Sequence, residues 1–292
     1  MSSASKNLPS NKKVIAAIQG ELGAYSQQAV YSFFGREMVK RVLPLPTLQR
    51  VFLVLCQKSG APDFAVVPIE NSLAGSVGET IDLLISKNVR IVGETSIPIQ
   101  HCLIIHRDTS LSKIKKVMSH PQALAQCREY LDGKHWEQLS VYDTAGSVKM
   151  IKEQKLKDAA GIASELASEI YGMKIVKNGI EDDPTNTTRF VVIQDARKNS
   201  VPTEPSGDDK TSAIFATKHE PGCLVRALSV LSLNGINLNR IESRPFRGRP
   251  WEYYFYVDFS GHIKEEKIRK AVEELREEVE ELKILGSYKR RV

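Results

Sequence analysis

The sequence predicts an α/β protein with a larger N-terminal domain and a smaller, ferredoxin-like α+β domain at the C-terminus. Three observations support this prediction. Short apolar runs alternate with helical patterns as far as residue 194, which is typical of α/β layers with a largely parallel sheet. Residues 195–210 are polar and contain two prolines, which indicates a linker. The order βαββαβ follows, with one strand not located, and indicates a sheet covered by two helices.

The composition narrows the functional classes. The 292 residues include 41 Lys plus Arg and 35 Asp plus Glu, so the formal net charge is +6. Hydrophobic residues form 41% and charged residues 26% of the chain, which excludes a largely disordered or collagen-like protein. Because the basic residues are interleaved with acids, we expect no nucleic-acid partner. A small positive surplus suits a protein that binds anionic small molecules.

The cysteines and the apolar runs indicate a cytoplasmic protein. Cys56, Cys102, Cys127 and Cys223 are far apart and form no Cys-x-x-Cys pair, so we expect reduced thiols and no metal site. No apolar run approaches the roughly 18 residues of a membrane span. Residues 1–13 are polar and lack the apolar core of a signal peptide, so we expect a disordered tail. A plastid or another organelle, after processing, is the alternative location.

The elements of the N-terminal domain are predicted from short apolar runs. Residues 14–18 form the first strand. After a turn, apolar residues recur at helical spacing up to Gly35, which ends the helix from the C′ position. Further strands are predicted at 64–67, 103–105, 161–163 and 189–193.

The C-terminal domain begins with a predicted strand at 211–217. A turn at 220–222 precedes an amphipathic helix, and Asn234-Gly235 ends it. Strands at 236–242 and 253–259 follow, and the second has strong β propensity. The predicted apolar faces of the two helices consist of Leu224, Ala227, Leu228 and Leu231 in the first, and of Ile268, Val272, Leu275, Val279 and Leu282 in the last.

Two polar runs lie at the ends of predicted strands, and open α/β sheets bind ligands at the C-terminal ends of their strands. The strand at 64–67 leads into the run PIENS at 68–72, with Gly75 and Gly78 close behind. The run NTTRF at 186–190 enters the last strand, and an Arg at a strand mouth can hold a carboxylate through two hydrogen bonds. The alternative for both runs is an ordinary polar loop or strand end.

Three predicted helix starts offer N–H groups that can bind an anion. The run GELGAYS at 20–26 follows a strand and opens a helix. The run SHPQ at 119–122 matches a capping box with Ser119 as the N-cap. Residues 143–147 match a further start of the same kind. A purely structural role is the alternative at each of them.

Together these stretches resemble the prephenate dehydratases that carry a C-terminal ACT regulatory domain. The resemblance covers residues 14–288, nearly the whole chain. Each stretch alone is modest evidence, but six in the family's order are highly specific. The matching stretches are GELGAYS at 20–26, VPIENS at 67–72, SHPQALAQC at 119–127, NTTRF at 186–190, PGCL at 221–224 and ESRP at 242–245.

The resemblance implies a catalytic domain at 14–194 made of two α/β lobes, like periplasmic binding proteins. The motifs of this domain would face the cleft between the lobes. Lobe one would comprise 14–96 and 179–194, lobe two 97–178, the linker 195–210 and the ACT domain 211–288.

The implied reaction converts prephenate to phenylpyruvate in L-phenylalanine biosynthesis, with loss of water and carbon dioxide. It requires no metal or organic cofactor. Thr188 would donate a hydrogen bond or a proton to the departing hydroxyl, with Glu70 as the titratable alternative. Arg189 and the helix starts at Ser119 and Thr144 would hold carboxylates. Phe190 completes the expected catalytic residues, and Ser26, Asn71, Ser72 and Asn186 the expected substrate-binding residues.

The second domain is similar to ACT domains that sense L-phenylalanine, which implies feedback regulation. ACT domains pair across subunits, so we expect a homodimer or a homotetramer. The implied effector-binding residues are Gly222, Cys223, Leu224, Asn237, Leu238, Glu242, Ser243 and Arg244.

Two departures from the family pattern leave the substrate open. Ala24 replaces the usual Thr, and Ala74 stands where many bacterial members carry Glu. Both look closer to arogenate dehydratases, so an enzyme that forms phenylalanine directly from arogenate is the alternative. A more remote alternative is a non-catalytic protein that binds an amino acid or another solute.

Overall fold

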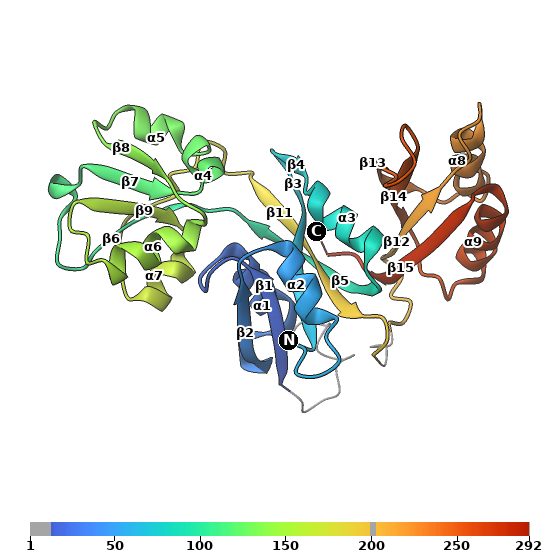
Figure 1. The fold of residues 1–292 in the computed structure, drawn as a ribbon, viewed down its shortest axis with the longest axis horizontal. Helices are drawn as coiled ribbons and strands as arrows, with labels where there is room; N and C mark the ends of the chain where they lie inside the picture. Colours follow the sequence, from blue (N-terminus) through green and yellow to red (C-terminus); the bar gives the residue numbers. More distant parts are fainter. Residues whose placement is uncertain (1–12, 199–202, 292) are drawn as a thin grey trace.

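The structure is a computed structural model that describes residues 13–198 and 203–291. Most of the expected tail, 1–12, and residues 199–202 of the expected linker lie outside the described residues. Three sheets, each with its own helices, stand in a row (Figure 1). We call the central unit the first lobe, the unit on the left the second lobe, and the unit on the right the C-terminal domain.

The first lobe is built on a mixed sheet in the order β2-β1-β3-β11-β5, with the short β4 paired to β3. β1 runs parallel to β2 and β3, whereas β11 runs antiparallel to both of its neighbours. The elements are β1 (Val14–Gln19), α1 (Tyr25–Phe34), β2 (Val39–Leu45), α2 (Leu48–Leu55), β3 (Phe64–Asn71), β4 (Gly75–Ser76), α3 (Gly78–Ser86), β5 (Val89–Pro98) and β11 (Thr187–Asp195), with a 3₁₀ turn at Arg36–Met38.

The second lobe has a five-stranded sheet in the order β10-β6-β9-β7-β8. β7 is parallel to β8 and β9, whereas β6 is antiparallel to β9 and β10. The elements are β6 (Cys102–Ile105), β7 (Lys116–Ser119), α4 (Pro121–Ala125), α5 (Arg128–Asp132), β8 (Glu137–Ser140), α6 (Thr144–Glu153), β9 (Ala159–Ala163), α7 (Glu165–Tyr171) and β10 (Lys174–Asn178), with a 3₁₀ turn at Leu111–Lys113.

The prediction of a largely parallel sheet is wrong for both lobes. The chain leaves the first lobe after β5 and returns in β11, so Thr187 of the incoming strand pairs with Pro98 of the outgoing strand. A strand that re-enters where its neighbour left must run antiparallel to that neighbour. The individual strand predictions are confirmed, and Gly35 ends α1 with a φ of 84° as expected.

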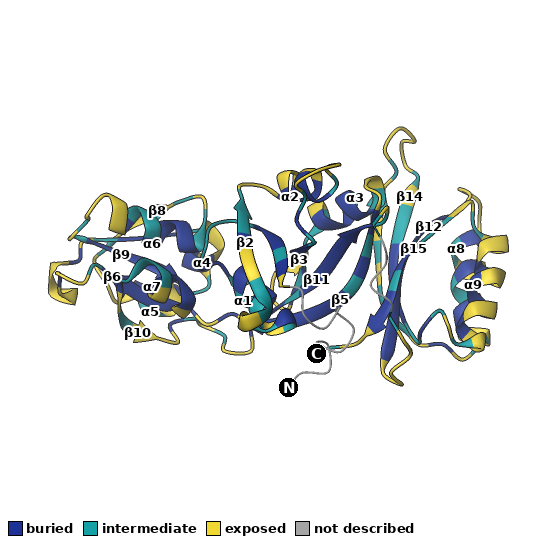
Figure 2. Cartoon of the chain, turned by 90° about the horizontal axis from the view of Figure 1, so that it is seen from below, coloured by how far each residue is buried: buried dark blue, intermediate teal, exposed yellow. Residues whose placement is uncertain are grey.

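The C-terminal domain is an antiparallel sheet in the order β13-β14-β12-β15, and α8 and α9 cover one face of it (Figure 2). The predicted ferredoxin-like fold is confirmed, but the last helix ends at Glu278, before Val279 and Leu282. Leu282 belongs to the strand that the sequence analysis did not locate. Leu282 packs on the same apolar core as α9, so helical spacing alone could not show that it lies outside the helix. The elements are β12 (Asp209–Ala216), α8 (Cys223–Leu233), β13 (Leu238–Pro245), β14 (Tyr253–Ser260), α9 (Glu266–Glu278) and β15 (Glu281–Lys289).

The helix-free face of this sheet packs against the first lobe. Ile214 and Tyr256 share a buried apolar cluster with Ile81, Leu84 and Ile91 of the first lobe. β12 is therefore buried at every position, because helices cover one of its faces and the first lobe covers the other. Within the described ranges, no helix is both long and apolar enough to cross a membrane.

Candidate functional site

A cavity of about 520 Å³ lies between the two lobes. The first lobe contributes the end of β1, the turn before α1, the β3–β4 hairpin and the start of β11. The second lobe contributes the starts of α4 and α6. The segment that connects β5 to β6 supplies the remaining lining residues. The cavity is lined by Gln19, Ala24, Tyr25, Ser26, Pro68, Asn71, Ala74, Gly75, Ser76, Val77, Ile99, His101, His120, Gln122, Ala123, Gln126, Tyr142, Asp143, Thr144, Thr188 and Phe190.

The structure brings together half of the expected catalytic and substrate-binding residues. Ser26, Asn71, Thr144, Thr188 and Phe190 line the cavity. The residues that do not line it are Glu70, Ser72, Ser119, Asn186 and Arg189. Each of these five has a structural role that the packing explains.

Thr188 is held in the cavity wall by the pairing of β11 with β3. Thr188 lies opposite Asn71 in this antiparallel register. The Asn71 amide nitrogen donates to the Thr188 hydroxyl oxygen at 2.9 Å and to the Asn186 side-chain oxygen at 2.7 Å. Because the Thr188 oxygen already accepts a hydrogen bond, its own proton can point to a molecule in the cavity. Asn186 is 1% exposed, and its hydrogen bond with Asn71 fixes the Asn71 side chain from the buried side of the cavity wall.

Ser72 and Ser119 stabilise the backbone beside the cavity. The Ser72 hydroxyl accepts from the backbone N–H of Thr187 at 3.0 Å, which ties the loop after β3 to the start of β11. The fully buried Ser119 donates to the carbonyl of Ile162 at 2.7 Å. The prediction that Ser119 is the N-cap of α4 is wrong. The N-cap is His120, whose Nδ1 accepts from the N–H of Gln122, because Ser119 still belongs to β7.

The expectation that Arg189 holds a substrate carboxylate is not met by this geometry. Successive side chains of a strand point to opposite faces, so Arg189 points away from the cavity that Thr188 faces. Its guanidinium pairs with Glu70 at 2.7 Å, with Glu94 at 3.4 Å and with Asp258 of the C-terminal domain at 2.9 Å. The ion pair with Arg189 holds the Glu70 carboxylate on the same face of the sheet, away from the cavity. Glu70 is therefore not placed to act on a molecule in the cavity.

These side chains belong to a larger group that we call the interdomain charge cluster. Lys210 lies 2.6 Å from Glu94 and 3.8 Å from Asp258. Asp258 is fully buried. Burial alone would raise the pKa of its carboxyl, but the charges of Lys210 and Arg189 outweigh burial and lower the pKa. The cluster consists of three carboxylates, Glu70, Glu94 and Asp258, and three cations, Arg189, Lys210 and Arg240.

The cavity has the opposite electrostatic character. Its lining contains no Lys or Arg, and Asp143 is its one carboxylate among the described residues. The helix start predicted at 143–147 is confirmed, because Asp143 is the N-cap of α6 and accepts from the N–H of Gly146 at 2.8 Å. Burial raises the pKa of its carboxyl. Burial likewise lowers the pKa of His101, so both groups shift toward their neutral forms.

Tyr25 and His101 are site residues that were not predicted individually from the sequence. The Tyr25 hydroxyl lies 2.9 Å from Nδ1 of His101 and donates to the carbonyl of Gln100 at 2.8 Å. His101 Nε2 lies 3.1 Å from the Gln126 side-chain oxygen. Tyr25 stands within the GELGAYS run, which offered a signal. His101 stands in the crossing between the lobes, where no periodic pattern marks it.

The expected effector residues divide between the two faces of the C-terminal sheet. Gly222 and Leu224 line a hollow of about 410 Å³ at the turn before α8, together with Phe255. Ser243 pairs with Phe255 and so points to the same face of the sheet as α8 and α9, where it is exposed at the sheet edge. Cys223 is buried beside it, where Arg226 donates to its sulfur at 3.0 Å.

Glu242 and Arg244 point to the other face, toward the first lobe. Arg244 forms two hydrogen bonds with Asp82 of α3, at 2.8 and 2.9 Å. Asn237 precedes β13, and Leu238 opens this strand at the edge of the sheet. No group of three or more His, Cys, Asp or Glu side chains in the described part of the chain is arranged to hold a metal ion.

Comparisons with known proteins agree with the motifs. The family model "Prephenate dehydratase" matches residues 16–198, and the model "ACT domain" matches 214–277. A bifunctional chorismate mutase/prephenate dehydratase of Aquifex aeolicus is 40% identical over 95% of this chain and 74% of its own length. Arogenate dehydratase/prephenate dehydratase 2 of Arabidopsis thaliana is 38% identical over 97% of this chain and 74% of its own length.

Two solved structures are similar over nearly the whole chain. A prephenate dehydratase of Arthrobacter aurescens in complex with L-Phe has a TM-score of 0.84 and 30% identity, covering 95% of this chain and 90% of that one. A protein described as GqqA, a novel type of quorum quenching acylases, has the same TM-score and 31% identity, covering 94% and 97%. This chain therefore belongs to the prephenate dehydratase family of hydro-lyases and carries the family's C-terminal ACT domain.

Proposed function

We propose that this enzyme removes water and carbon dioxide from prephenate to form phenylpyruvate, and that Thr188 assists the departure of the hydroxyl. The observation that carries this proposal is the hydrogen bond from Asn71 to the Thr188 oxygen, in the wall of the cavity between the lobes. It leaves the Thr188 proton available to a hydroxyl in the cavity. Phe190 lies on the same face of β11 and offers an apolar wall to the ring.

The reaction can proceed without a redox step. The bond from the ring to its carboxylate breaks, and its electron pair enters the ring as carbon dioxide leaves. The hydroxyl departs from the opposite ring carbon with the electrons of its own bond and takes a proton to become water. Thr188 would hydrogen-bond to this hydroxyl or relay the proton. A cavity with no Lys or Arg in its wall binds the leaving carboxylate weakly, which favours its loss as neutral carbon dioxide.

The second carboxylate of the substrate requires hydrogen-bond donors. The start of α6 places Thr144 in the cavity wall, where the Thr144 hydroxyl and the backbone N–H groups that Asp143 does not cap can donate to an anion. Ser26 at the start of α1 adds a hydroxyl from the first lobe. We expect Thr144 and Ser26 to hold this group between the two lobes.

The test is product formation by the purified protein, with prephenate and arogenate offered separately at equal concentration. Phenylpyruvate from prephenate, at a higher kcat/KM than the arogenate reaction, would support the proposal. Faster formation of phenylalanine from arogenate would make the chain an arogenate dehydratase. Turnover of neither by a folded protein would favour a non-catalytic binding protein.

Asp143 is the specific observation that favours arogenate as the second candidate substrate. Arogenate carries an ammonium group where prephenate carries a keto group. Among the described residues, no Lys or Arg affects the Asp143 carboxyl, so an ammonium in the cavity would not have to displace a Lys or Arg partner. The Asp143→Asn variant keeps an N-cap for α6. It should lower kcat/KM for arogenate by about 10-fold and leave that for prephenate equal or higher. Equal loss with both substrates would exclude this role.

We propose that L-phenylalanine inhibits the enzyme through the C-terminal domain. Support comes from the hollow that contains Gly222 and Leu224 beside the positive-φ turn before α8. Inhibition requires that the effector bind one conformation more tightly than another. We also propose a homodimer or homotetramer paired through these domains, since β13 is an edge strand. Titration of activity with L-phenylalanine and light scattering at several protein concentrations test both statements.

We further propose a cytoplasmic location and the domain limits 14–194 and 211–288. The four cysteines are free thiols in the structure, which agrees with a reducing compartment. Fractionation of cells that express the native gene tests the location. Limited proteolysis, with cleavage expected between 195 and 210, tests the limits.

A further inference from the structure

Strand β13 of the C-terminal domain directs every second side chain toward the first lobe. Arg240, Glu242 and Arg244 are partly covered, whereas the residues between them are exposed. The register explains this alternation, because Glu242 pairs with Tyr256, which is buried against the first lobe. One face of an edge strand therefore meets the catalytic domain.

Arg240 and Glu242 form hydrogen bonds with the hairpin made of β3 and β4. Arg240 Nη2 donates to the Ser76 hydroxyl at 2.6 Å and approaches the carbonyl of Ile69 at 3.4 Å. The Ser76 hydroxyl in turn donates to Glu242. Arg240 Nη2 and Glu242 lie 3.2 Å apart, which closes a triangle of three polar groups. The Arg240 side chain is only 8% exposed, whereas Ser76, which it contacts, is exposed at the surface.

This hairpin forms part of the cavity wall. Ser76 and Gly75 line the cavity and pair with Glu70 and Asn71 across the hairpin. Asn71 is the residue that donates to Thr188. β4 is only two residues long and both are exposed, so the hairpin has little apolar packing of its own. A hairpin this short depends on outside contacts for its position.

We propose that Arg240, with Glu242, is a positioning residue that holds the β3–β4 hairpin against the cavity, so that the placement of Asn71 and Thr188 depends on strand β13. The same strand carries Ser243 on its other face, beside the hollow in which we place L-phenylalanine. A displacement of β13 in response to the effector would reach the cavity through Ser76. The inference rests on the proposed function for its kinetic readout, but not for its structural one.

Lys283 provides a matched control. It is a second cation of the C-terminal domain that donates to carbonyls of the first lobe, at 2.7 Å to Leu84 and 2.6 Å to Lys87. These carbonyls lie at the end of α3, away from the cavity lining. Lys283→Met and Arg240→Met each remove one interdomain cation and leave an unbranched apolar side chain. Only the second should change the hairpin.

The kinetic experiment compares Arg240→Met, Arg240→Lys, Ser76→Ala and Lys283→Met in the full-length enzyme. We expect Arg240→Met to lower kcat for prephenate by about 10-fold or more, because small displacements of reacting groups are costly. Arg240→Lys should recover part of this loss, and Lys283→Met should stay within about 2-fold of wild type. The double variant of Arg240→Met and Ser76→Ala should lose no more than the worse single variant, since both break one connection.

Hydrogen exchange supplies a readout that does not require turnover. The N–H groups of Leu73 and Ala74 donate to Asn71, and that of Val77 donates to Ile69. Arg240→Met should accelerate exchange at these amides, and Lys283→Met should not. Equal exchange and equal kcat in the two folded variants would overturn the inference. An inactive wild type would overturn the proposed function alone, because the exchange result would still decide this inference. If Arg240→Met fails to fold, Glu242→Gln takes its place in the comparison.

Discussion

The two faces of strand β11 carry opposite chemistry one residue apart. On one face Thr188 lines a cavity without Lys or Arg, where burial shifts the pKa values of Asp143 and His101 toward the neutral forms. On the other face Arg189 joins a cluster in which partner charges keep Asp258 ionised. Removing a partner from a buried charge is costly, which ties the cluster to the domain arrangement, whereas groups that form no salt bridge remain available to a ligand.

One motif therefore contributes both to the cavity and to the interdomain charge cluster. In the run NTTRF, the alternation of a strand sends Thr188 and Phe190 to the cavity and Arg189 to the C-terminal domain. A motif that resembles a single catalytic unit therefore also contributes to the contact between domains. The following predictions test whether the two faces are as separate as the geometry indicates.

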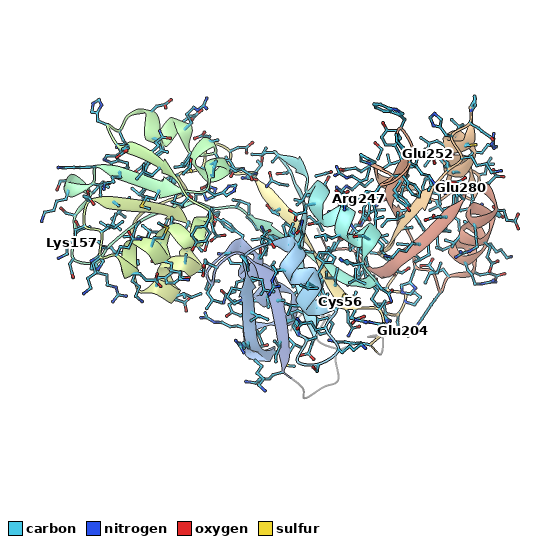
Figure 3. All side chains as sticks on the ribbon, in the orientation of Figure 1. Cys56, Lys157, Glu204, Arg247, Glu252 and Glu280 are labelled. Atoms are coloured by element: carbon cyan, nitrogen blue, oxygen red, sulfur yellow. The ribbon has the colours of Figure 1, made fainter. Side chains whose placement is uncertain are left out.

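The largest expected effect is on stability, from the cluster face. Asp258→Ala removes one of the two buried carboxylates that Arg189 and Lys210 share, which should lower the free energy of unfolding by about 3–5 kcal/mol. Chemical denaturation monitored by circular dichroism measures this loss. The control is Glu280→Gln, since Glu280 and Glu252, which lie in the upper part of the C-terminal domain in Figure 3, both pair with the exposed Arg249. That change should cost about 1 kcal/mol or less.

The second effect is on activity, from the cavity face. Thr188→Ala should reduce kcat by about 10²-fold or more, because a hydrogen bond that strengthens as the hydroxyl departs is lost. Thr188→Ser keeps the hydroxyl and should retain most of the activity. Both variants should unfold close to the wild-type midpoint. Near-normal turnover by Thr188→Ala would remove Thr188 from the mechanism and would break the proposed separation of the two faces.

The third effect is the pH dependence of the stability that Asp258 contributes on the cluster face. The pKa of Asp258 is lowered in the folded protein, so its stabilising contribution is complete above its unfolded value of about 3.9. The contribution is lost as the pH falls through the lower, folded value. The difference in unfolding free energy between wild type and Asp258→Ala should therefore be constant from pH 7 to about 4 and narrow below that. A difference that narrows near neutral pH would contradict this assignment.

The smallest effect concerns His101 on the cavity face. Burial lowers the pKa of its imidazole against the opposing hydrogen bond to Gln126, so the ring is neutral near pH 7. His101→Gln should leave the shape of the pH profile of kcat/KM unchanged between about pH 6.5 and 8. Loss of a titration step from that range in the variant would show that His101 is charged during turnover.

Most of the fold could be predicted from the sequence, because its strands and helices follow local apolar patterns. The runs at 14–18 and 64–67 and the amphipathic helix before Asn234 all lie within observed elements. β15 could not be located, because Leu282 continues the apolar spacing of α9. The antiparallel direction of β11 could not be predicted either, because it depends on where the chain re-enters the sheet.

The family, the α/β and ferredoxin-like elements, and the motifs that contain Asn71 and Thr188 all follow from the sequence. Which residues of those motifs meet the cavity follows only from how the chain packs. Arg189 contacts Glu94 and Asp258, which are 95 and 69 positions away in the chain, and no local pattern predicts such partners. Local propensities define each element, but the face that an element buries depends on which distant element packs against it.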